Sequence, residues 1–241
     1  MRIGVVSDIH SNLTALLAVL GDMGPVDTLW CLGDFVGYGP WPNECIDLLR
    51  ERGAHAIAGN HDLAVVGVIS CEDFTGDAAF AAQWTLDQLS ADSRAYLASL
   101  EPMTEVAGVT LAHGTPREPV WEYMLSAATA AAGFETIRTD LCLVGHTHIP
   151  SLFVEHESGV PEVSYMPGGS TSPCAPLRRI VNPGSVGQPR DRDSRAAYLV
   201  YDTDDAELSW RRVQYDIAKV QKRMRTLGLP TFLTERLAYG V

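Results

Sequence analysis

Short apolar runs alternate with helix-like segments over the first quarter of the chain, and this order constrains the fold more than any other feature. Three runs have the apolar character of buried strands: residues 3–6, 28–32 and 54–58. Between the first two, residues 13–20 carry apolar side chains at helical spacing after Ser11 and Asn12, either of which can cap a helix. A second helix is expected near Pro42. The β-α-β-α-β order predicts an α/β fold.

Strand-like runs crowd together in the rest of the chain. Helices are predicted at residues 77–100, with a break near Ser90, and at residues 121–133 and 216–227. Strands are predicted at residues 103–106, 109–113, 141–144, 151–155, 163–166, 179–181, 196–202 and 208–215. The Gly-, Ser- and Pro-rich residues 166–177 predict a surface loop. We therefore expect one domain, residues 1–241, with two packed sheets and helices outside. The last helix should dock on the chain's own sheet.

Composition excludes several classes of protein. With 241 residues, 46% of them hydrophobic, the chain can bury a substantial core, but no stretch is apolar for long enough to cross a bilayer. The first residues lack a hydrophobic signal region, so we expect a cytoplasmic protein. Five scattered cysteines without a CxxC pair favour buried thiols. The net charge of −12 disfavours nonspecific binding to nucleic acid or anionic membranes.

Polar clusters follow five of the apolar runs. They are Asp8-Ile9-His10, Gly33-Asp34, Gly59-Asn60-His61-Asp62, Ala112-His113-Gly114 and Gly145-His146-Thr147-His148. Five of the seven histidines lie in these clusters. Strand ends at the carboxyl edge of an α/β sheet converge on one crevice, where ligands bind. We therefore expect these clusters to become neighbours in space.

Metal binding is the chemistry that the clustered donors favour. The donors are the carboxylates of Asp8 and Asp34, the imidazoles of His10, His113, His146 and His148, and the amide oxygen of Asn60. They are too many for one tetrahedral zinc and suit two ions of higher coordination number. The thiolate-free set predicts two divalent transition metal ions, with manganese, iron, zinc, nickel or cobalt favoured over copper(I), calcium or magnesium. Scattered caps and core histidines are the alternative interpretation.

The clusters resemble the motif series of the calcineurin-like metallophosphoesterase superfamily: D-x-H, G-D, G-N-H-[DE], H and G-H-x-H. The resemblance spans about residues 3–190. Residues 33–45 (GDFVGYGPWPNEC) and 181–191 (VNPGSVGQPRD) are similar to the small prokaryotic phosphodiesterase branch. The resemblance implies a two-sheet β-sandwich flanked by helices on both sides, an α-β-β-α fold, with a dinuclear site at one edge. It also implies a small-molecule phosphate ester as substrate.

The resemblance assigns a role to each donor. The implied ligands are Asp8, His10 and His148 for one ion, Asn60, His113 and His146 for the other, and Asp34 as the bridge between them. In this interpretation Thr147 is a spacer, which places two imidazoles on the same side of the chain so that each reaches a different ion.

The implied mechanism is hydrolysis by a metal-bound hydroxide. Two divalent ions would lower the pKa of a bound water, and the resulting hydroxide would attack phosphorus in line. Their charge would exceed that of Asp8 and Asp34, so the site would stay positive in an acidic protein. His61, which has no metal assignment, is expected to protonate the leaving alkoxide and to pair with Asp62 or Asp34. Packing behind the site is the alternative role for His61.

Residues that bind substrate are less strongly indicated. Gly37 and Tyr38 stand where protein phosphatases of the superfamily carry an Asp-Arg pair, which weighs against activity on phosphoproteins. Arg117 and Arg190 follow polar clusters, and each can supply a guanidinium fork for phosphate or a surface ion pair. Tyr38 and Trp121 are candidates for stacking on an aromatic group, with loop packing as the alternative. Asn182 and Ser185 are expected to orient ligand loops.

The favoured function is a dinuclear metal-dependent phosphodiesterase acting on a small phosphate ester. A phosphomonoesterase or a nucleotide pyrophosphohydrolase is the alternative within the same chemistry. A noncatalytic metal-binding scaffold is a third possibility, which the complete set of ligand positions disfavours. No membrane partner is expected, and a nucleic-acid partner is disfavoured.

Overall fold

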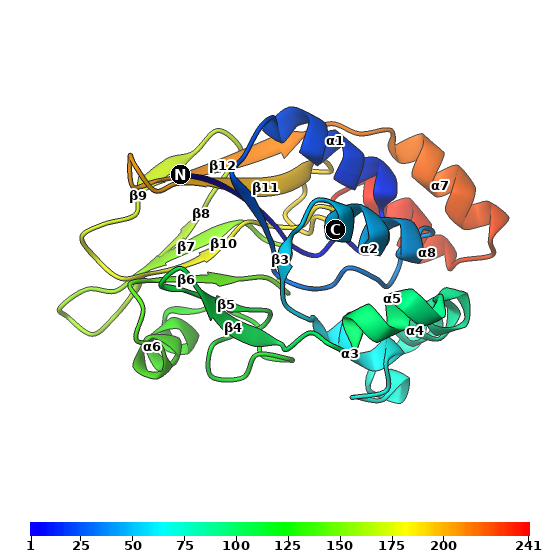
Figure 1. Cartoon of the computed structure of the whole chain (residues 1–241), viewed down its shortest axis with the longest axis horizontal. Coiled ribbons are helices and arrows are strands. Elements are labelled where there is room, and N and C mark those ends of the chain that lie inside the picture. The colour runs from blue at the N-terminus through cyan, green and yellow to red at the C-terminus, as the bar shows by residue number, and fades with distance from the viewer.

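The computed structural model describes all 241 residues and contains two six-stranded sheets packed face to face, with helices on both outer sides (Figure 1). The predicted α-β-β-α architecture is confirmed. The helices are α1 (Leu13–Met23), α2 (Pro42–Glu51), α3 (Asn60–Val65), α4 (Gly76–Gln88), α5 (Ala91–Leu97), α6 (Ala127–Thr136), α7 (Ile217–Thr226) and α8 (Thr231–Glu235), with 3-10 turns η1 (Cys71–Asp73) and η2 (Arg236–Ala238).

The first sheet contains the predicted β-α-β-α-β unit. Its strands, in spatial order, are β3 (His55–Ala56), β2 (Thr28–Cys31), β1 (Arg2–Val6), β11 (Ala196–Asp202), β12 (Glu207–Val213) and β9 (Thr171–Pro173). Strands β1, β2 and β3 are parallel, so their carboxyl ends lie at the same edge. The remaining strands are antiparallel to their neighbours.

The second sheet also contains three parallel strands. Its strands, in spatial order, are β4 (Met103–Val106), β5 (Val109–Ala112), β6 (Leu141–Val144), β10 (Arg179–Asn182), β7 (Ser151–Val154) and β8 (Glu162–Tyr165). Strands β5, β6 and β10 are parallel in its centre. Each sheet therefore directs a set of parallel strand ends toward one edge.

Strand β6 shows why the apolar runs are continuous. Leu141 and Leu143 pack in the interior between the two sheets, whereas Cys142 and Val144 pack outward in the cluster that includes Phe134 of α6. A strand that is buried on both faces needs apolar side chains at every position. Helices α1 and α2 cover the outer face of the first sheet in the same way (Figure 1).

Two predicted segments differ from the structure. Residues 121–133 were expected to be helical, but α6 begins only at Ala127, because the Ser126 hydroxyl caps it by accepting from the Thr129 N–H at 3.1 Å. Residues 166–177 were expected to be a loop throughout, but they contain β9, which pairs with β12 at the sheet edge.

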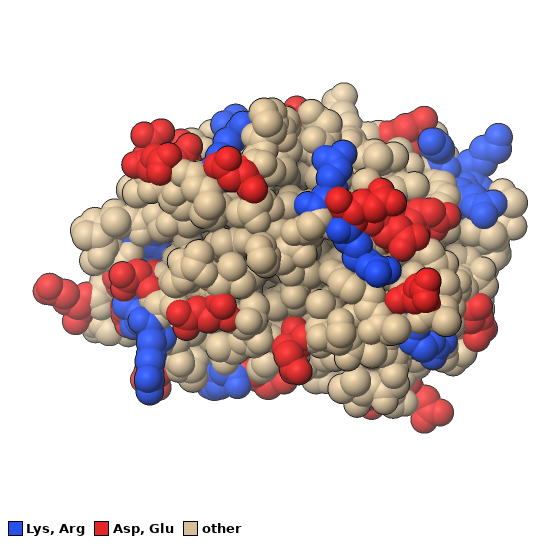
Figure 2. Space-filling view, viewed as in Figure 1, with Lys and Arg blue, Asp and Glu red and all other residues tan.

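Helix α7, which corresponds to the last helix predicted from the sequence, packs elsewhere than expected. Its buried residues Val220 and Met224 lie in a cluster with Tyr38, Ala81 of α4 and residues of α8, rather than on a sheet. The C-terminal segment thus supports the loop that carries Tyr38. None of the helices combines the length and the apolar character that a membrane crossing requires. On the face drawn in Figure 2, acidic and basic side chains are interspersed with uncharged surface, without a continuous basic area.

Candidate metal centre

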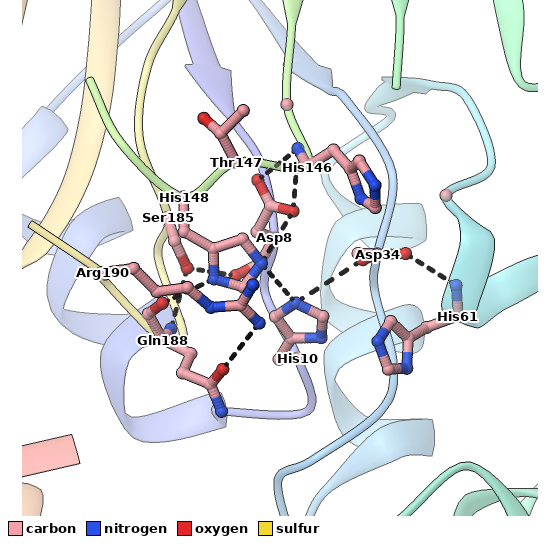
Figure 3. A network of polar contacts seen from close by, with 12 residues as sticks. Asp8, His10, Asp34, His61, His146, Thr147, His148, Ser185, Gln188 and Arg190 are labelled. Atoms are coloured by element: carbon pink, nitrogen blue, oxygen red, sulfur yellow. Dashed lines mark hydrogen bonds and ion pairs between the residues drawn. The ribbon is translucent and has the colours of Figure 1, made fainter. Parts of the chain in front are cut away.

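The strand ends of both sheets bring the predicted donors together. Asp8 and His10 follow β1, Asp34 follows β2, Asn60 follows β3, His113 follows β5, and His146 and His148 follow β6. All seven side chains are at most 4% exposed. Figure 3 shows several of them, including Asp8, Asp34 and His146, pointing toward one another. The sequence prediction that these residues become neighbours is confirmed.

The backbone at the strand ends is strained. Asp8, His10, Asp34, His146 and His148 all have φ between 46° and 65°, in the left-handed region that residues with a side chain seldom adopt. Space is also limited, because a Cβ at Gly59 would collide with the Asp34 carboxylate. Such conformations persist only where the surrounding structure fixes them, and they turn these side chains into the cleft.

The donors form two groups that share Asp34. In the first group, His10 Nε2 lies 3.1 Å from His148 Nε2 and 3.5 Å from Asp34 Oδ2. His148 Nε2 lies 3.4 Å from Asp8 Oδ1. The four ligand atoms of Asp8, His10, Asp34 and His148 are all within 4.8 Å of one another, which is close enough for one cation.

The second group lies on the other side of Asp34. His113 Nε2 is 3.4 Å from Asp34 Oδ2 and 3.2 Å from Asn60 Oδ1. A ligand atom of His146 lies within 4.8 Å of those of Asp34 and His113. Asp34 is therefore the carboxylate common to both groups, in the position predicted for a bridge.

The imidazole tautomers test whether cations fit here. The Nδ1–H of His10 donates to the Val36 carbonyl at 2.9 Å, and that of His148 donates to the Gln188 carbonyl at 2.6 Å. Their Nε2 atoms, 3.1 Å apart, then face each other with lone pairs only. Carbonyl partners on the second nitrogen are usual for metal-binding histidines. A cation between the two Nε2 atoms would satisfy both, so the residues present fit a metal ion.

Protonation does not relieve this contact between His10 and His148. Burial lowers the pKa of both imidazoles well below the usual value, so both are neutral, the form that binds metal. Burial also raises the pKa of Asp8 to about 7, against the attraction of His113. The donors of the first group thus carry no positive charge of their own, which a bound cation would supply.

The second group has a different protonation state. Burial opposes a charge on His113, but the Asp34 carboxylate outweighs it and raises the pKa of His113 to about 9. The His113 Nδ1–H donates to the Leu32 carbonyl at 2.8 Å, so the added proton lies on Nε2, facing Asp34. His146 donates from Nε2 to the Trp121 carbonyl at 3.2 Å, which leaves its Nδ1 for a metal.

Residues at the end of β10 and just after it hold the ligand loops in place. The Asn182 side-chain amide donates to the Gly145 carbonyl at 2.7 Å and to Thr147 Oγ1 at 3.0 Å. The Ser185 hydroxyl donates to the Asp8 carbonyl at 2.8 Å. The expectation that Asn182 and Ser185 orient ligand loops agrees with these contacts. Thr147 does more than space two histidines, since its hydroxyl anchors the loop to β10.

Asp62 and His61 are neighbours in sequence, but their side chains have different surroundings. The Asp62 carboxylate accepts the backbone N–H groups of Gly59, Phe35 and Val36 at 2.9–3.3 Å, so it fixes two loops and does not contact the His61 ring. Asp34 Oδ1 accepts the backbone N–H of His61 at 2.9 Å. The buried His61 Nδ1 has no hydrogen-bond partner, and burial lowers the pKa of this histidine to about 4. Neither Asp62 nor Asp34 therefore pairs with the imidazole as the sequence suggested.

A cleft of about 240 Å³ opens onto the centre. Its lining residues are Asp34, Tyr38, Asn60, His61, Asp73, Phe74, Thr75, Ala78, Trp121, Tyr123, His146, His148 and Arg190. Arg190 and Tyr38, both predicted to bind substrate, are thus at the site, with the guanidinium 5.9 Å from the centre of the Tyr38 ring. Arg117 is not brought to the cleft, because it is exposed and pairs with Glu122. Sequence reasoning missed Asp73, Phe74 and Tyr123, which belong to no motif.

Comparison with known proteins shows relatives of similar sequence and fold. A calcineurin-like phosphoesterase superfamily domain matches residues 1–206. The chain belongs to this superfamily. An uncharacterized protein of Methanocaldococcus jannaschii is 38% identical, over 99% of this chain and 98% of that protein. The crystal structure of a metallophosphoesterase from Sphaerobacter thermophilus is 45% identical, with a TM-score of 0.92 over 100% of this chain and 99% of that one.

A shorter similarity concerns one named activity. A symmetrical bis(5'-nucleosyl)-tetraphosphatase of Neisseria gonorrhoeae is 37% identical over 68 residues, which are 27% of this chain and 25% of that protein. The similarity covers too little of either chain to transfer a substrate. The family to which this protein belongs is one of phosphoesterases. Its structure contains clustered residues that could hold metal ions.

Proposed function

We propose that the protein is a dinuclear metal-dependent phosphodiesterase that hydrolyses a small phosphate ester. The observation that carries the proposal is the position of Asp34 between two groups of donors, 3.5 Å from His10 and 3.4 Å from His113. One ion would be held by Asp8, His10, Asp34 and His148, and the other by Asp34, Asn60, His113 and His146. When bound, two such ions supply a nucleophilic water of lowered pKa and neutralise the phosphate charge.

The chain's own residues would position the ester and handle its proton. Arg190 lines the cleft and is held by Gln188, whose Oε1 accepts from Nη2 at 3.0 Å. A guanidinium at the cleft is suited to a nonbridging phosphate oxygen. His61 also lines the cleft; its Nδ1 packs against Gly37, so its other nitrogen, Nε2, would donate a proton or a hydrogen bond to the departing oxygen.

His61 is kept in place by the loop that departs from the protein-phosphatase pattern. A Cβ at Gly37, where φ is +89°, would collide with the His61 ring, so this position requires glycine. Tyr38 lies 4.5 Å from His61 between ring centres. The loop thus uses Gly37 and Tyr38 to pack the histidine, and it contributes no arginine to the phosphate.

The scarcity of cations favours a diester over a monoester. Arg190 is the only arginine or lysine that lines the cleft. A diester carries one negative charge at neutral pH, and a monoester close to two. A nucleotide pyrophosphohydrolase is the second candidate, supported by the 68-residue similarity to bis(5'-nucleosyl)-tetraphosphatase.

A substrate panel with manganese tests the proposal. We expect hydrolysis of bis-p-nitrophenyl phosphate to exceed that of p-nitrophenyl phosphate and of diadenosine tetraphosphate in kcat/KM. Faster release from the monoester, or from the tetraphosphate, would replace the proposed reaction with one of the alternatives. The variant His113→Asn should lose the activity, while His55→Asn, at an exposed position outside the site, should retain it. Equal, low activity in all three proteins would indicate a noncatalytic scaffold.

A further inference from the structure

We propose that the cleft selects diesters with a single phosphate group and a planar aromatic substituent, which stacks on an aromatic wall formed by Phe74, Trp121 and Tyr123. This inference rests on the proposed phosphodiesterase function and specifies its substrate class. The wall comes from two segments distant in sequence, the turn after η1 and the loop before α6.

Two rings of the wall, Phe74 and Tyr123, contact histidines of the centre, and Phe74 also contacts Trp121. The Phe74 ring centre lies 5.2 Å from that of Trp121 and 4.6 Å from that of His61. Tyr123 stacks on His146 at 4.2 Å with an angle of 8° between the ring planes. An aromatic group resting on this wall is therefore within one ester linkage of the donors and of His61.

The exposure of the wall indicates an absent partner. Trp121 is 37% exposed and Tyr123 is 44% exposed, although both line a cleft. Tyrosine and tryptophan gain free energy when aromatic surface is covered, and aromatic pairs add a geometry-specific contribution. The Trp121 carbonyl also accepts from His146, so the loop is anchored to the centre before any ligand binds.

Charge and size limit the substrate to one phosphate. Arg190 and Asp73 both line the cleft, Arg190 beside the Tyr38 ring and Asp73 next to Phe74 in the sequence. Additional phosphates would extend along the cleft without a second arginine or lysine, and some would meet Asp73. The volume of about 240 Å³ is below the range of roughly 300–1,000 Å³ usual for ligand sites. A neutral ring fits the aromatic side better than a polyphosphate chain.

Calorimetry with paired inhibitors on the manganese-loaded protein tests the inference. Phenylphosphonate and cyclohexylphosphonate have the same charge and nearly the same size, and neither has a P–O ester bond to cleave. We expect the phenyl compound to bind about 2- to 10-fold more tightly. Phe74→Leu should remove this preference, Phe74→Tyr should keep it, and Phe80→Leu, at an exposed position of α4 outside the cleft, should leave it unchanged.

A second set of ligands identifies the source of the aromatic group and tests the limit on phosphates. Two affinity ratios are compared: adenosine 5'-monophosphate against ribose 5-phosphate, and phenylphosphonate against cyclohexylphosphonate. If the first ratio is larger, the aromatic group belongs to a nucleoside ester. If the first ratio is smaller, the substrate is a simple aryl ester. Equal binding of the two phosphonates by the wild type, or binding of diadenosine tetraphosphate more than ten-fold tighter than the monophosphate, would overturn the inference. Hydrolysis of bis-p-nitrophenyl phosphate in the same preparation keeps the proposed function standing in either case.

Discussion

The interior between the two sheets and the cleft at their edge are almost equally hidden from solvent. Leu199 and Trp210 are at most 1% exposed in the interior, and Asp8 and His113 are fully buried at the cleft. The interior is apolar, and its strands have ordinary backbone conformations. The cleft is polar, and five of its donor residues have left-handed backbone conformations. Burial alone therefore does not distinguish a region that stabilises the fold from one that is organised for a ligand.

The two regions differ in whether their buried side chains satisfy one another. Apolar side chains in the interior satisfy one another, and their burial stabilises the folded chain. At the cleft, the Nε2 atoms of His10 and His148 face each other with lone pairs, and buried carboxylates lie beside them. Natural proteins retain such unfavourable contacts mainly at functional sites. Substitutions at the cleft should therefore lower mainly activity, and substitutions in the interior should lower mainly the free energy of unfolding.

Asp34→Asn should produce the largest effect on activity. Loss of the shared carboxylate should lower kcat/KM for bis-p-nitrophenyl phosphate by roughly 10³-fold, because metal-ion catalysis supplies several kcal/mol. The amide oxygen can still accept the His61 N–H, so the free energy of unfolding should change by less than a core truncation does. Steady-state kinetics and urea unfolding measure both. Asp87→Asn, at an exposed position on α4, is the matched control.

Leu199→Ala should show the opposite behaviour. Removing this buried side chain from β11 should lower the free energy of unfolding by about 2–5 kcal/mol, while the activity per folded molecule stays within about two-fold. Leu17→Ala, which truncates a half-exposed side chain of α1, should change stability by less than about 0.5 kcal/mol. A loss of activity in folded Leu199→Ala comparable to that of Asp34→Asn would erase the distinction between the regions.

Asn182→Asp should have an intermediate effect that is confined to the cleft. The carboxylate cannot donate to the Gly145 carbonyl and to Thr147, so the loop carrying His146 and His148 should lose its anchor. We expect metal affinity to fall about 10- to 100-fold, as for other residues that orient metal ligands. Metal titration of the purified variant measures this. Asn43→Asp removes a comparable amide donor, to the Gln88 carbonyl, far from the site and should leave metal affinity intact.

Thr147→Val should give the smallest effect. It removes the hydroxyl that accepts from Asn182 and from the Ile149 N–H, which is worth about 1 kcal/mol per hydrogen bond. Metal affinity should fall by less than in Asn182→Asp, and Thr147→Ser should behave like the wild type. If valine and serine variants were indistinguishable, Thr147 would be only the spacer that the sequence suggested.

The sequence predicted the interior well for a physical reason. Strands such as β6 are buried on both faces, so their composition alone reveals them. The donors were also predictable, since polar side chains that directly follow several such strands are typical of a ligand site at the sheet edge. The same logic placed Asn182 and Ser185 behind the centre.

Other parts of the cleft could not be predicted, because they depend on tertiary contacts. Phe74 and Tyr123 are ordinary aromatic residues in sequence, and only the fold brings them to the donors. Arg117 and Arg190 follow similar clusters, but Glu122, five residues after Arg117, pairs with it at the surface. The left-handed conformations of Asp8 and His10 leave no mark on the sequence either, since neither is glycine.

Anomalous diffraction from crystals grown with manganese would show whether Asp34 joins two ions. We expect two manganese peaks per chain, both coordinated by the Asp34 carboxylate, one beside His10 and His148 and the other beside His113 and His146. A single peak, or two peaks of which only one contacts Asp34, would rule out the shared bridge.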